Sequence, residues 1–268
     1  AGLAWNETIN AFLTDPDGCA MVRGDAEPGL YSKRVGKEMS EQLAMSLYVD
    51  DGKLYFDPTP HGTAEAEKLI GQLKGRWKIQ VQERDQADTY LLSANIHRHS
   101  ASWTSIALRT YIEKAVREHL PKALESYPSK WGENPCDKSL MLDYEAALAK
   151  ADVLTGPEAD RFCTLTGVLQ FATSFRPDVS FPVGVGGRCR TFPTRKMLEH
   201  MERVLVYLGR TASLAINYTG DHPDARTLTG FCDADWYVRR STTGYVIKLA
   251  GGAISHGSRR QHCIAMST

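Results

Sequence analysis

The apolar positions of this chain follow two periods, one typical of helices and one typical of strands. Apolar residues three or four positions apart predict helices over residues 3–13, 63–77, 107–124, 144–148, 158–174 and 194–209. Short apolar runs bounded by turn residues predict strands at 42–49, 53–56, 90–96, 213–218, 226–232, 243–249 and 252–256. Strands therefore flank a largely helical middle, which indicates an α+β fold whose last strands form an antiparallel meander.

Turn residues refine this picture at two places. Asp50-Asp51-Gly52 separates the first two predicted strands, and Asp-Gly between apolar runs is a strong signal for a β-hairpin. The helix predicted over 63–77 would pack behind that hairpin. Residues 127–139 are polar and rich in Pro, Ser, Gly and Asn, so we interpret them as a linker or mobile loop.

Composition places the chain among ordinary globular proteins. Of its 268 residues, 42% are apolar and 24% are charged, close to the averages for folded domains. No apolar run approaches the roughly 20 residues of a membrane-spanning helix, so we expect no membrane partner. The Cys residues are widely spaced without a Cys-x-x-Cys pair, which favours free thiols in a reducing compartment over a disulfide or zinc framework.

The net charge of +0 conceals an uneven distribution. Residues 181–268 hold 12 of the 32 Lys and Arg residues but 6 of the 32 Asp and Glu residues. A basic C-terminal third suits a polyanionic partner but is also common on ordinary surfaces. The excess therefore gains meaning only beside a motif.

Two adjacent carboxylates at the predicted hairpin tip form the first candidate site. Like charges this close raise each other's pKa, and a divalent cation removes that cost. Hard oxygen ligands suit Mg²⁺, which keeps several waters and completes its shell with substrate phosphates. Asp50 and Asp51 are therefore either metal ligands or members of a solvated turn, and spacing alone favours the turn.

Longer motifs change that balance. Residues 47–51, Leu-Tyr-Val-Asp-Asp, contain the YVDD signature of reverse transcriptases. Further segments resemble copia-type (Ty1/copia) retrotransposon polyproteins: Ala1-Gly2-Leu3-Ala4-Trp5-Asn6 is similar to AGRAWN, 27–31 to DPCLY, 175–179 to TRPDI, and 193–208 to the PT…H…VLRYLKGT helix. The segments Leu228–Trp236, Arg240–Tyr245, 251–255 and 258–261 resemble the start of the copia RNase H domain. The resemblance keeps its order over nearly the whole chain.

This resemblance implies a division into four parts. They are the C-terminal part of a reverse transcriptase palm (1–97), a thumb-like helical region (98–160), a connection (161–225) and the N-terminal strands of a truncated RNase H-like domain (226–268). The α+β fold would then consist of a partial polymerase palm (a β-hairpin sheet with helices), a helical thumb and connection, and an incomplete RNase H-like mixed sheet.

The resemblance also implies an activity and its carboxylates. The chain would be part of an RNA-directed DNA polymerase with RNase H, using two-metal nucleotidyl transfer with Mg²⁺ or Mn²⁺. Asp50 and Asp51 would be metal ligands of the palm. Asp233 would be the first metal ligand of the RNase H site, and Asp235, on the same strand face, is the less favoured candidate there.

Nucleic-acid contacts and partners follow from the same resemblance. Tyr48 and Val49 would contact the primer terminus, residues 90–96 would lie near the primer, and the basic pair Arg259 and Arg260 is either a phosphate contact or a solvated turn. The partners would be an RNA template, an RNA/DNA hybrid, dNTP and the remainder of a Gag-Pol-like polyprotein. The location would be cytoplasmic virus-like particles and the nucleus.

The sequence departs from the family pattern in ways that bear on activity. The third palm carboxylate of the family lies upstream of the AGRAWN-like segment, and the RNase H Glu follows Ser267-Thr268, so we expect this chain to be inactive or nearly so by itself. Ser93 stands where the YFLGI-like strand has Gly, and His256 stands where the family commonly has Trp. We interpret His256 as an ordinary histidine rather than a metal ligand.

Two other functions compete with this interpretation. One is a non-catalytic retrotransposon remnant that acts at most as a nucleic-acid or protein binding module. The other is an unrelated Mg²⁺-dependent phosphohydrolase that uses Asp50 and Asp51, which the remaining motifs disfavour. A fragment cut through two domains would leave open sheet edges and exposed apolar faces, so we also predict poor solubility or self-association.

Overall fold

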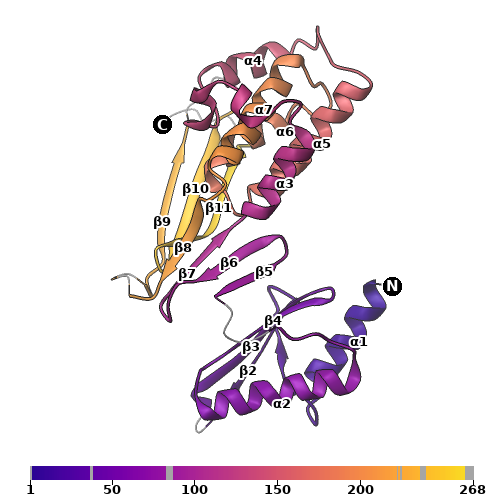
Figure 1. Cartoon of the computed structure of the whole chain (residues 1–268), viewed down its shortest axis with the longest axis vertical. Helices are drawn as coiled ribbons and strands as arrows, with labels where there is room; N and C mark the ends of the chain where they lie inside the picture. The colour runs from indigo at the N-terminus through magenta and orange to yellow at the C-terminus, as the bar shows by residue number, and fades with distance from the viewer. Residues whose placement is uncertain are drawn as a thin grey trace. The chain divides into compact units, whose positions relative to one another are not determined.

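A computed structural model describes residues 2–36, 39–82, 87–221, 223, 225–235 and 240–262. The chain divides into two compact units, Ala1–Asp85 and Gln86–Thr268. Each unit combines helices with antiparallel sheets (Figure 1), which confirms the predicted α+β class. The finer division into palm, thumb, connection and RNase H parts stays a prediction. Trp236, Ser267 and Thr268 lie outside the described residues.

The first unit is a four-stranded antiparallel sheet with two helices. The strand order is β1-β2-β3-β4, and α2 runs along the sheet (Figure 1). The elements are α1 (Gly2–Thr14), β1 (Val22–Arg23), β2 (Leu30–Val35), β3 (Glu41–Tyr48), β4 (Asp51–Phe56) and α2 (Pro60–Arg76). Thr59 caps α2 by accepting a 2.9 Å hydrogen bond from the Gly62 N–H, and Pro60 begins the helix.

Alternation along β3 decides which face of this sheet is buried. Leu43 and Met45 point into the core, whereas their neighbours on the other face are at least partly exposed. The core is completed from both helices and from β2, by Ile9, Leu13, Cys19, Met21, Tyr31, Val35, Ala66, Leu69 and Leu73. One face of the sheet is thus covered, and the opposite face is free to carry a site.

The second unit holds two further antiparallel sheets and a helical core. The sheets have the strand orders β5-β6-β7-β8 and β11-β10-β9. The strands are β5 (Asp88–Leu91), β6 (Ala94–Arg98), β7 (Trp103–Ala107), β8 (Ala215–Thr219), β9 (Thr229–Ala234), β10 (Thr242–Leu249) and β11 (Gly252–Arg260). The helices are α3 (Arg109–His119), η2 (Leu124–Ser126), η3 (Ser129–Gly132), α4 (Ser139–Ala147), α5 (Pro157–Ala172), η4 (Pro177–Val179), α6 (Ser180–Gly187) and α7 (Arg195–Arg210).

Helix α7 is the centre of the helical core. Thr194 caps it through a 3.3 Å hydrogen bond from the Met197 N–H, as its position before the apolar pattern predicts. Helices α3, α4, α5 and α6 all pack against α7 (Figure 1). Because α7 is enclosed on several sides, residues such as Val204 and Leu205 are fully buried.

The predicted strand 90–96 is wrong, because a turn divides it. Strand β5 ends at Leu91 and β6 begins at Ala94, and the two pair as a hairpin. The turn residues Leu92 and Ser93 have φ of 49° and 68°. Positive φ at both central positions is the geometry of a type I′ turn, which favours Gly or Asn, so these residue types hid the turn.

The predicted linker at 127–139 is also wrong, because two arginines of α7 hold this segment. Arg210 donates hydrogen bonds to the carbonyl oxygens of Leu124, Tyr127, Pro128 and Ser129. Arg203 donates to the carbonyl oxygen of Asn134 at 3.1 Å and to the Asp137 carboxylate. The neighbouring helices shift accordingly, since α3 stops at His119 and α4 already begins at Ser139. This polar segment is therefore held to α7 by hydrogen bonds from the two arginines.

The C-terminal meander is confirmed for β9, β10 and β11, but β8 does not belong to it. Strand β8 pairs with β7, with Ile216 opposite Ile106, and the Trp103 indole donates to Asn217 Oδ1 at 3.1 Å. Pairing of consecutive strands is only the commonest arrangement, and these long-range contacts override it. All pairs described in the β11-β10-β9 sheet are antiparallel, so the expected mixed sheet is not seen among the described residues.

Candidate active sites

The YVDD segment forms the tip of the β3–β4 hairpin. Tyr48 pairs with Asp51, so the turn consists of Val49 and Asp50, and it begins one residue before and ends two residues before the predicted Asp50-Asp51-Gly52 turn. The pairs Leu43–Phe56 and Met45–Leu54 fix this register, since slipping the strands would move apolar side chains to the exposed face. The hairpin itself is confirmed, and the position of its turn is corrected.

The backbone at the tip is strained. Val49 has φ of 55°, a left-handed conformation that is unusual for a β-branched residue and costs about 1–2 kcal/mol. Such a conformation persists only where neighbouring groups enforce it. Strain at this residue therefore calls for an explanation in its surroundings.

Trp5 supplies one such restraint. Its indole N–H donates a 2.6 Å hydrogen bond to the Val49 carbonyl oxygen, and its ring packs edge-on to Trp77 with 5.5 Å between centroids. The hydrogen bond to the turn was not foreseen, although the AGRAWN-like segment was the signal that marked the residue.

The DPCLY-like segment restrains the end of β3 that leads into the turn. The Leu47 N–H donates to the Gly29 carbonyl oxygen at 2.7 Å. A Cβ atom at Gly29 would lie 2.7 Å from the Leu47 carbonyl oxygen, so only glycine allows this approach. Two motifs that lie far from YVDD in the sequence thus hold the strand that leads into it.

The carboxylates themselves are free. Asp50 and Asp51 are exposed, and within the described residues no hydrogen bond or ion pair occupies either side chain. Asp51 lies on the open face of the sheet beside Tyr48, which is 63% exposed. Among the described residues, no group of three or more His, Cys, Asp or Glu side chains is arranged to hold a metal ion.

Lys53 is a further candidate that the sequence did not single out. It lies on the same open face, two residues beyond Asp51 and opposite Ser46. Its ammonium group is 5.8 Å from the centre of the Tyr55 ring, and burial lowers the pKa of Lys53. Alternation along β4 is the signal that could have placed it beside Asp51.

Asp233 lies on β9, next to β10 within the β11-β10-β9 sheet. Directly paired residues share a face, so Asp233, Gly244 and Ser258 form one row across the three strands. This row borders a cavity of about 510 Å³ that Asp178 and Asp235 also line. A Cβ atom at Gly244 would meet no other atom closer than 4.0 Å, so the space beside Asp233 stays open.

Asp235 and Asp178 are engaged in structural roles. Asp235 accepts a hydrogen bond from the Thr242 N–H. Asp178 accepts from the Arg176 guanidinium and, at 2.8 Å, from the Tyr207 hydroxyl. Burial alone would raise the pKa of Asp178, but the hydrogen bonds and charge of Arg176, together with Tyr207, hold the pKa below its usual range.

The TRPDI-like segment thereby connects to the PT…H…VLRYLKGT-like helix. Arg176 is 2% exposed and also donates to the carbonyl oxygen and the hydroxyl of Thr211, just beyond α7. The same helix carries His200, whose Nε2 lies 2.8 Å from Asp143. Sequence reasoning found both motifs but missed that they are one network.

Arg259 and Arg260 have different surroundings. Arg260 Nη1 donates to the Tyr144 hydroxyl at 3.4 Å, whereas Arg259 lines a different cavity, beside His256. The structure thus brings together Tyr48, Val49, Asp50 and Asp51, and it brings Asp233 together with Asp235. No helix among the described residues is both long and apolar enough to cross a membrane.

The chain is similar in sequence to known transposon proteins. The chain is 29% identical over 265 residues to the transposon Ty5-1 protein of Saccharomyces cerevisiae, covering 97% of this chain and 78% of that protein. It is 27% identical over 273 residues to the retrovirus-related Pol polyprotein from transposon TNT 1-94 of Nicotiana tabacum, covering 98% of this chain. These relatives are retrotransposon proteins, which supports a retrotransposon polyprotein as the source of the chain.

Other comparisons limit what this similarity says about the chain. It spans 19% of the tobacco polyprotein. A stretch of 97 residues is 36% identical to the secreted RxLR effector protein 161 of Plasmopara viticola, covering 35% of this chain and 67% of that protein. No family model matches the segment, and no solved structure matches it. The similarity to copia-type polyproteins that the motifs predict is thus supported. The polymerase and RNase H activities stay predictions.

Proposed function

We propose that this chain is the part of a copia-type Pol polyprotein that carries the YVDD turn of the RNA-directed DNA polymerase and the first strands of its RNase H. The observation that carries the proposal is the hairpin tip. Two free carboxylates stand there on a strained and restrained turn, on the open face of a sheet whose other face is covered. The proposed substrates are an RNA template, an RNA/DNA hybrid and dNTP. The proposed locations of the reaction are virus-like particles and the nucleus.

The donor set fits a divalent cation in part. Mg²⁺ is usually held by one or two protein carboxylates, with waters and substrate phosphates completing the shell. Asp50 and Asp51 supply two hard oxygen donors of this kind, and Mn²⁺ accepts the same ligands. When bound, such an ion would activate the attacking hydroxyl and neutralise charge on the phosphates.

The remaining residues of the turn have separate tasks in this proposal. Trp5 and the β3–β4 ladder hold the backbone of Val49 and Asp50 in place. Tyr48 presents an exposed ring beside Asp51 that suits contact with a primer terminus. Lys53 adds a positive charge on the same face, where a phosphate of the bound strand would pass.

Primer extension on an RNA template with Mg²⁺ or Mn²⁺ tests the polymerase proposal. The assay compares this chain with a longer form of the polyprotein that includes upstream residues. We expect extension only in the longer form, and a loss of about 10³-fold in Asp50→Asn or Asp51→Asn, because metal ligands contribute several kcal/mol of transition-state stabilisation. Asp25→Asn, which removes an exposed carboxylate elsewhere in the first unit, should leave the rate unchanged.

Two results would contradict the proposal. Full activity in the Asp51→Asn longer form would remove the turn from the mechanism. A folded longer form that binds RNA/DNA hybrid but never extends a primer would favour the alternative, a non-catalytic nucleic-acid binding remnant. A form of the polyprotein extended downstream as well tests the RNase H part, since its cleavage of the hybrid should be lost in Asp233→Asn.

A further inference from the structure

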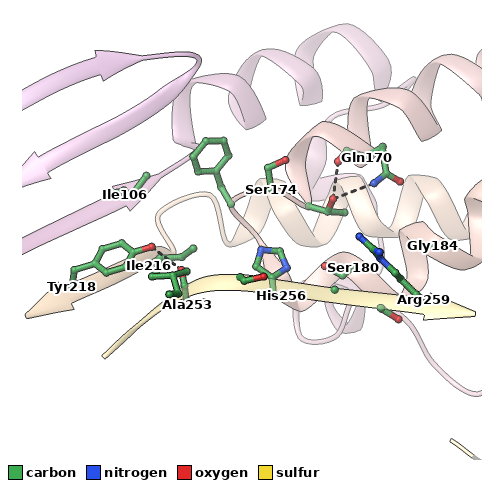
Figure 2. Close-up of a pocket in the computed structure, with 16 residues that line it drawn as sticks. Ile106, Gln170, Ser174, Ser180, Gly184, Ile216, Tyr218, Ala253, His256 and Arg259 are labelled. Atoms are coloured by element: carbon green, nitrogen blue, oxygen red, sulfur yellow. Dashed lines mark hydrogen bonds between the residues drawn. The ribbon is translucent and has the colours of Figure 1, made fainter. Parts of the chain in front are cut away.

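A second cavity of the Gln86–Thr268 unit lies along β11 and has a lining of unusual charge. It has a volume of about 530 Å³ and is bordered by the ends of α5, α6 and β8. Figure 2 shows His256 and Arg259 on the side of β11 that faces Gln170 and Ser174. Its lining contains the guanidinium of Arg259, one imidazole and several hydroxyl groups, but no Asp or Glu. A lining of this composition offers hydrogen-bond donors to an anion.

The Tyr218 hydroxyl and Thr173 Oγ1 of this lining donate hydrogen bonds within the protein, whereas other polar groups of the lining have no described partner. Among the described residues, Arg259 forms no ion pair. Ser180 Oγ and His256 Nδ1 are buried atoms without a hydrogen-bond partner in the described structure. Buried polar atoms are nearly always satisfied, so two orphaned atoms in one lining point to a missing partner. Oxygen atoms of a phosphate group would accept from Ser180, His256 and Arg259 together.

The cavity continues into the one beside Asp233. The two share Ser180, His256, Gly257 and Ser258 in their linings. Ser258 lies in the same row as Asp233, with Gly244 between them. Arg259 follows Ser258 on β11, and two strand spacings of about 4.8 Å separate β11 from β9. The backbone of Arg259 is therefore roughly 10 Å from the strand that carries Asp233. One groove therefore joins a cationic end to an acidic end.

We propose that the cavity lined by Arg259, His256 and Ser180 binds a phosphate group. Its placement next to the Asp233 cavity favours a phosphate of a nucleic-acid strand, and at about 3.4 Å of rise per nucleotide the groove spans roughly three nucleotides. This inference rests on the proposed function for the identity of the strand. The phosphate chemistry itself rests only on the cavity.

Binding of a labelled RNA/DNA hybrid to the full chain tests the proposal, with fluorescence anisotropy measured over a range of salt concentrations. Arg259→Gln should weaken binding about tenfold and lower the slope of log K against log salt by about 0.9, the value for one phosphate contact. Arg117→Gln is the matched control, because it removes one exposed charge of the same unit outside the cavity. It should change the affinity less than twofold.

Ser180→Ala separates a ligand role from a structural one. The hydroxyl has no described partner, so its removal should not lower the Tm of the ligand-free chain, yet it should weaken hybrid binding. Unchanged affinity and salt slope in both Arg259→Gln and Ser180→Ala, together with no effect of inorganic phosphate on the Tm of the chain, would overturn the proposal.

Inorganic phosphate distinguishes the two sources of the ligand. If phosphate raises the Tm of the chain but not of the Arg259→Gln variant, while hybrid binding is equal in both, the phosphate site stands and its nucleic-acid assignment is overturned. If Arg259 controls hybrid binding although no form of the polyprotein extends primers or cleaves hybrid, the inference stands and the proposed function fails.

Discussion

The Asp50–Asp51 turn and the region around Asp233 differ in how the protein surrounds its carboxylates. At the turn, the backbone is restrained by Trp5 and by the β2–β3 contact at Gly29, while both carboxylates stay free. Beside Asp233, the protein instead neutralises a neighbouring carboxylate, because Asp178 is bound by Arg176 and Tyr207. Free carboxylates on a fixed backbone suit ligand binding, whereas the bound Asp178 shapes the cavity that Asp233 faces.

The largest expected effect comes from the Asp178 network. Arg176→Ala should cost about 3–5 kcal/mol, since it leaves a partly buried carboxylate and the Thr211 carbonyl without their buried donor. Urea unfolding of the full chain measures this change. Arg195→Ala is the control, because its ion pair with Glu158 is exposed to solvent and should contribute little to stability. Equal losses in the two variants would mean that Asp178 is not held by Arg176.

This network also marks the limit of what could be predicted from the sequence. Periodicity placed the long helices α2, α5 and α7 within three residues of their observed bounds, and it was most accurate at α7, which has a strong apolar stripe and the cap Thr194. It could not show that Arg176 reaches Thr211, 35 residues away, because spacing carries no information about long-range side-chain contacts.

The candidate sites follow the same division between local and long-range signals. The YVDD letters identified Asp50 and Asp51, but the turn was predicted to begin one residue late, since register depends on the pairing of Met45 with Leu54 across the hairpin. The roles of Trp5 and Lys53 were missed for the same reason. The β5–β6 turn was missed because Leu92 and Ser93 are atypical of positive φ.

The contribution of Asp178 to the free energy of unfolding should depend on pH. The pKa of Asp178 is lowered in the folded chain, so its contribution to stability is full above the unfolded value of about 3.9 and is lost as the pH falls towards the folded pKa. Asp178→Asn should therefore cost about 1.5–3 kcal/mol at pH 7 and progressively less below pH 4. Urea unfolding at pH 7, 5, 4 and 3 measures the difference.

Glu65 of the first unit provides the comparison for this effect. A hydrogen bond from Lys33, at 2.9 Å, lowers the pKa of Glu65, so Glu65→Gln should show the same sign. Its effect should be smaller, because Lys33 is more exposed than Arg176 and because Asp178 also accepts a hydrogen bond from Tyr207. A pH-independent loss in Asp178→Asn would show that only the shape of the side chain matters.

The hydrogen bond of Trp5 to the turn should have an intermediate effect. Trp5→Phe keeps an aromatic ring but removes the N–H that bonds Val49, at a cost of about 1 kcal/mol beyond the smaller ring. Trp77→Phe is the matched control, because Trp77 packs against Trp5 and Phe12 without a described indole hydrogen bond. Chemical unfolding of both variants measures the difference, and equal losses would remove Trp5 as a restraint on the turn.

The smallest effect should come from Val49 itself, and its sign is the informative quantity. Val49→Asn replaces a β-branched residue at φ 55° by one that tolerates the left-handed region, so we expect a gain of about 0.5 kcal/mol. Val22→Asn is the control, since Val22 is 68% exposed against 59% for Val49 but has no positive φ. There the loss of strand propensity should cost up to about 0.5 kcal/mol. Opposite signs in thermal unfolding would show that the turn stores strain, whereas a loss at both positions would mean that the valine at the tip is held by contacts of its side chain.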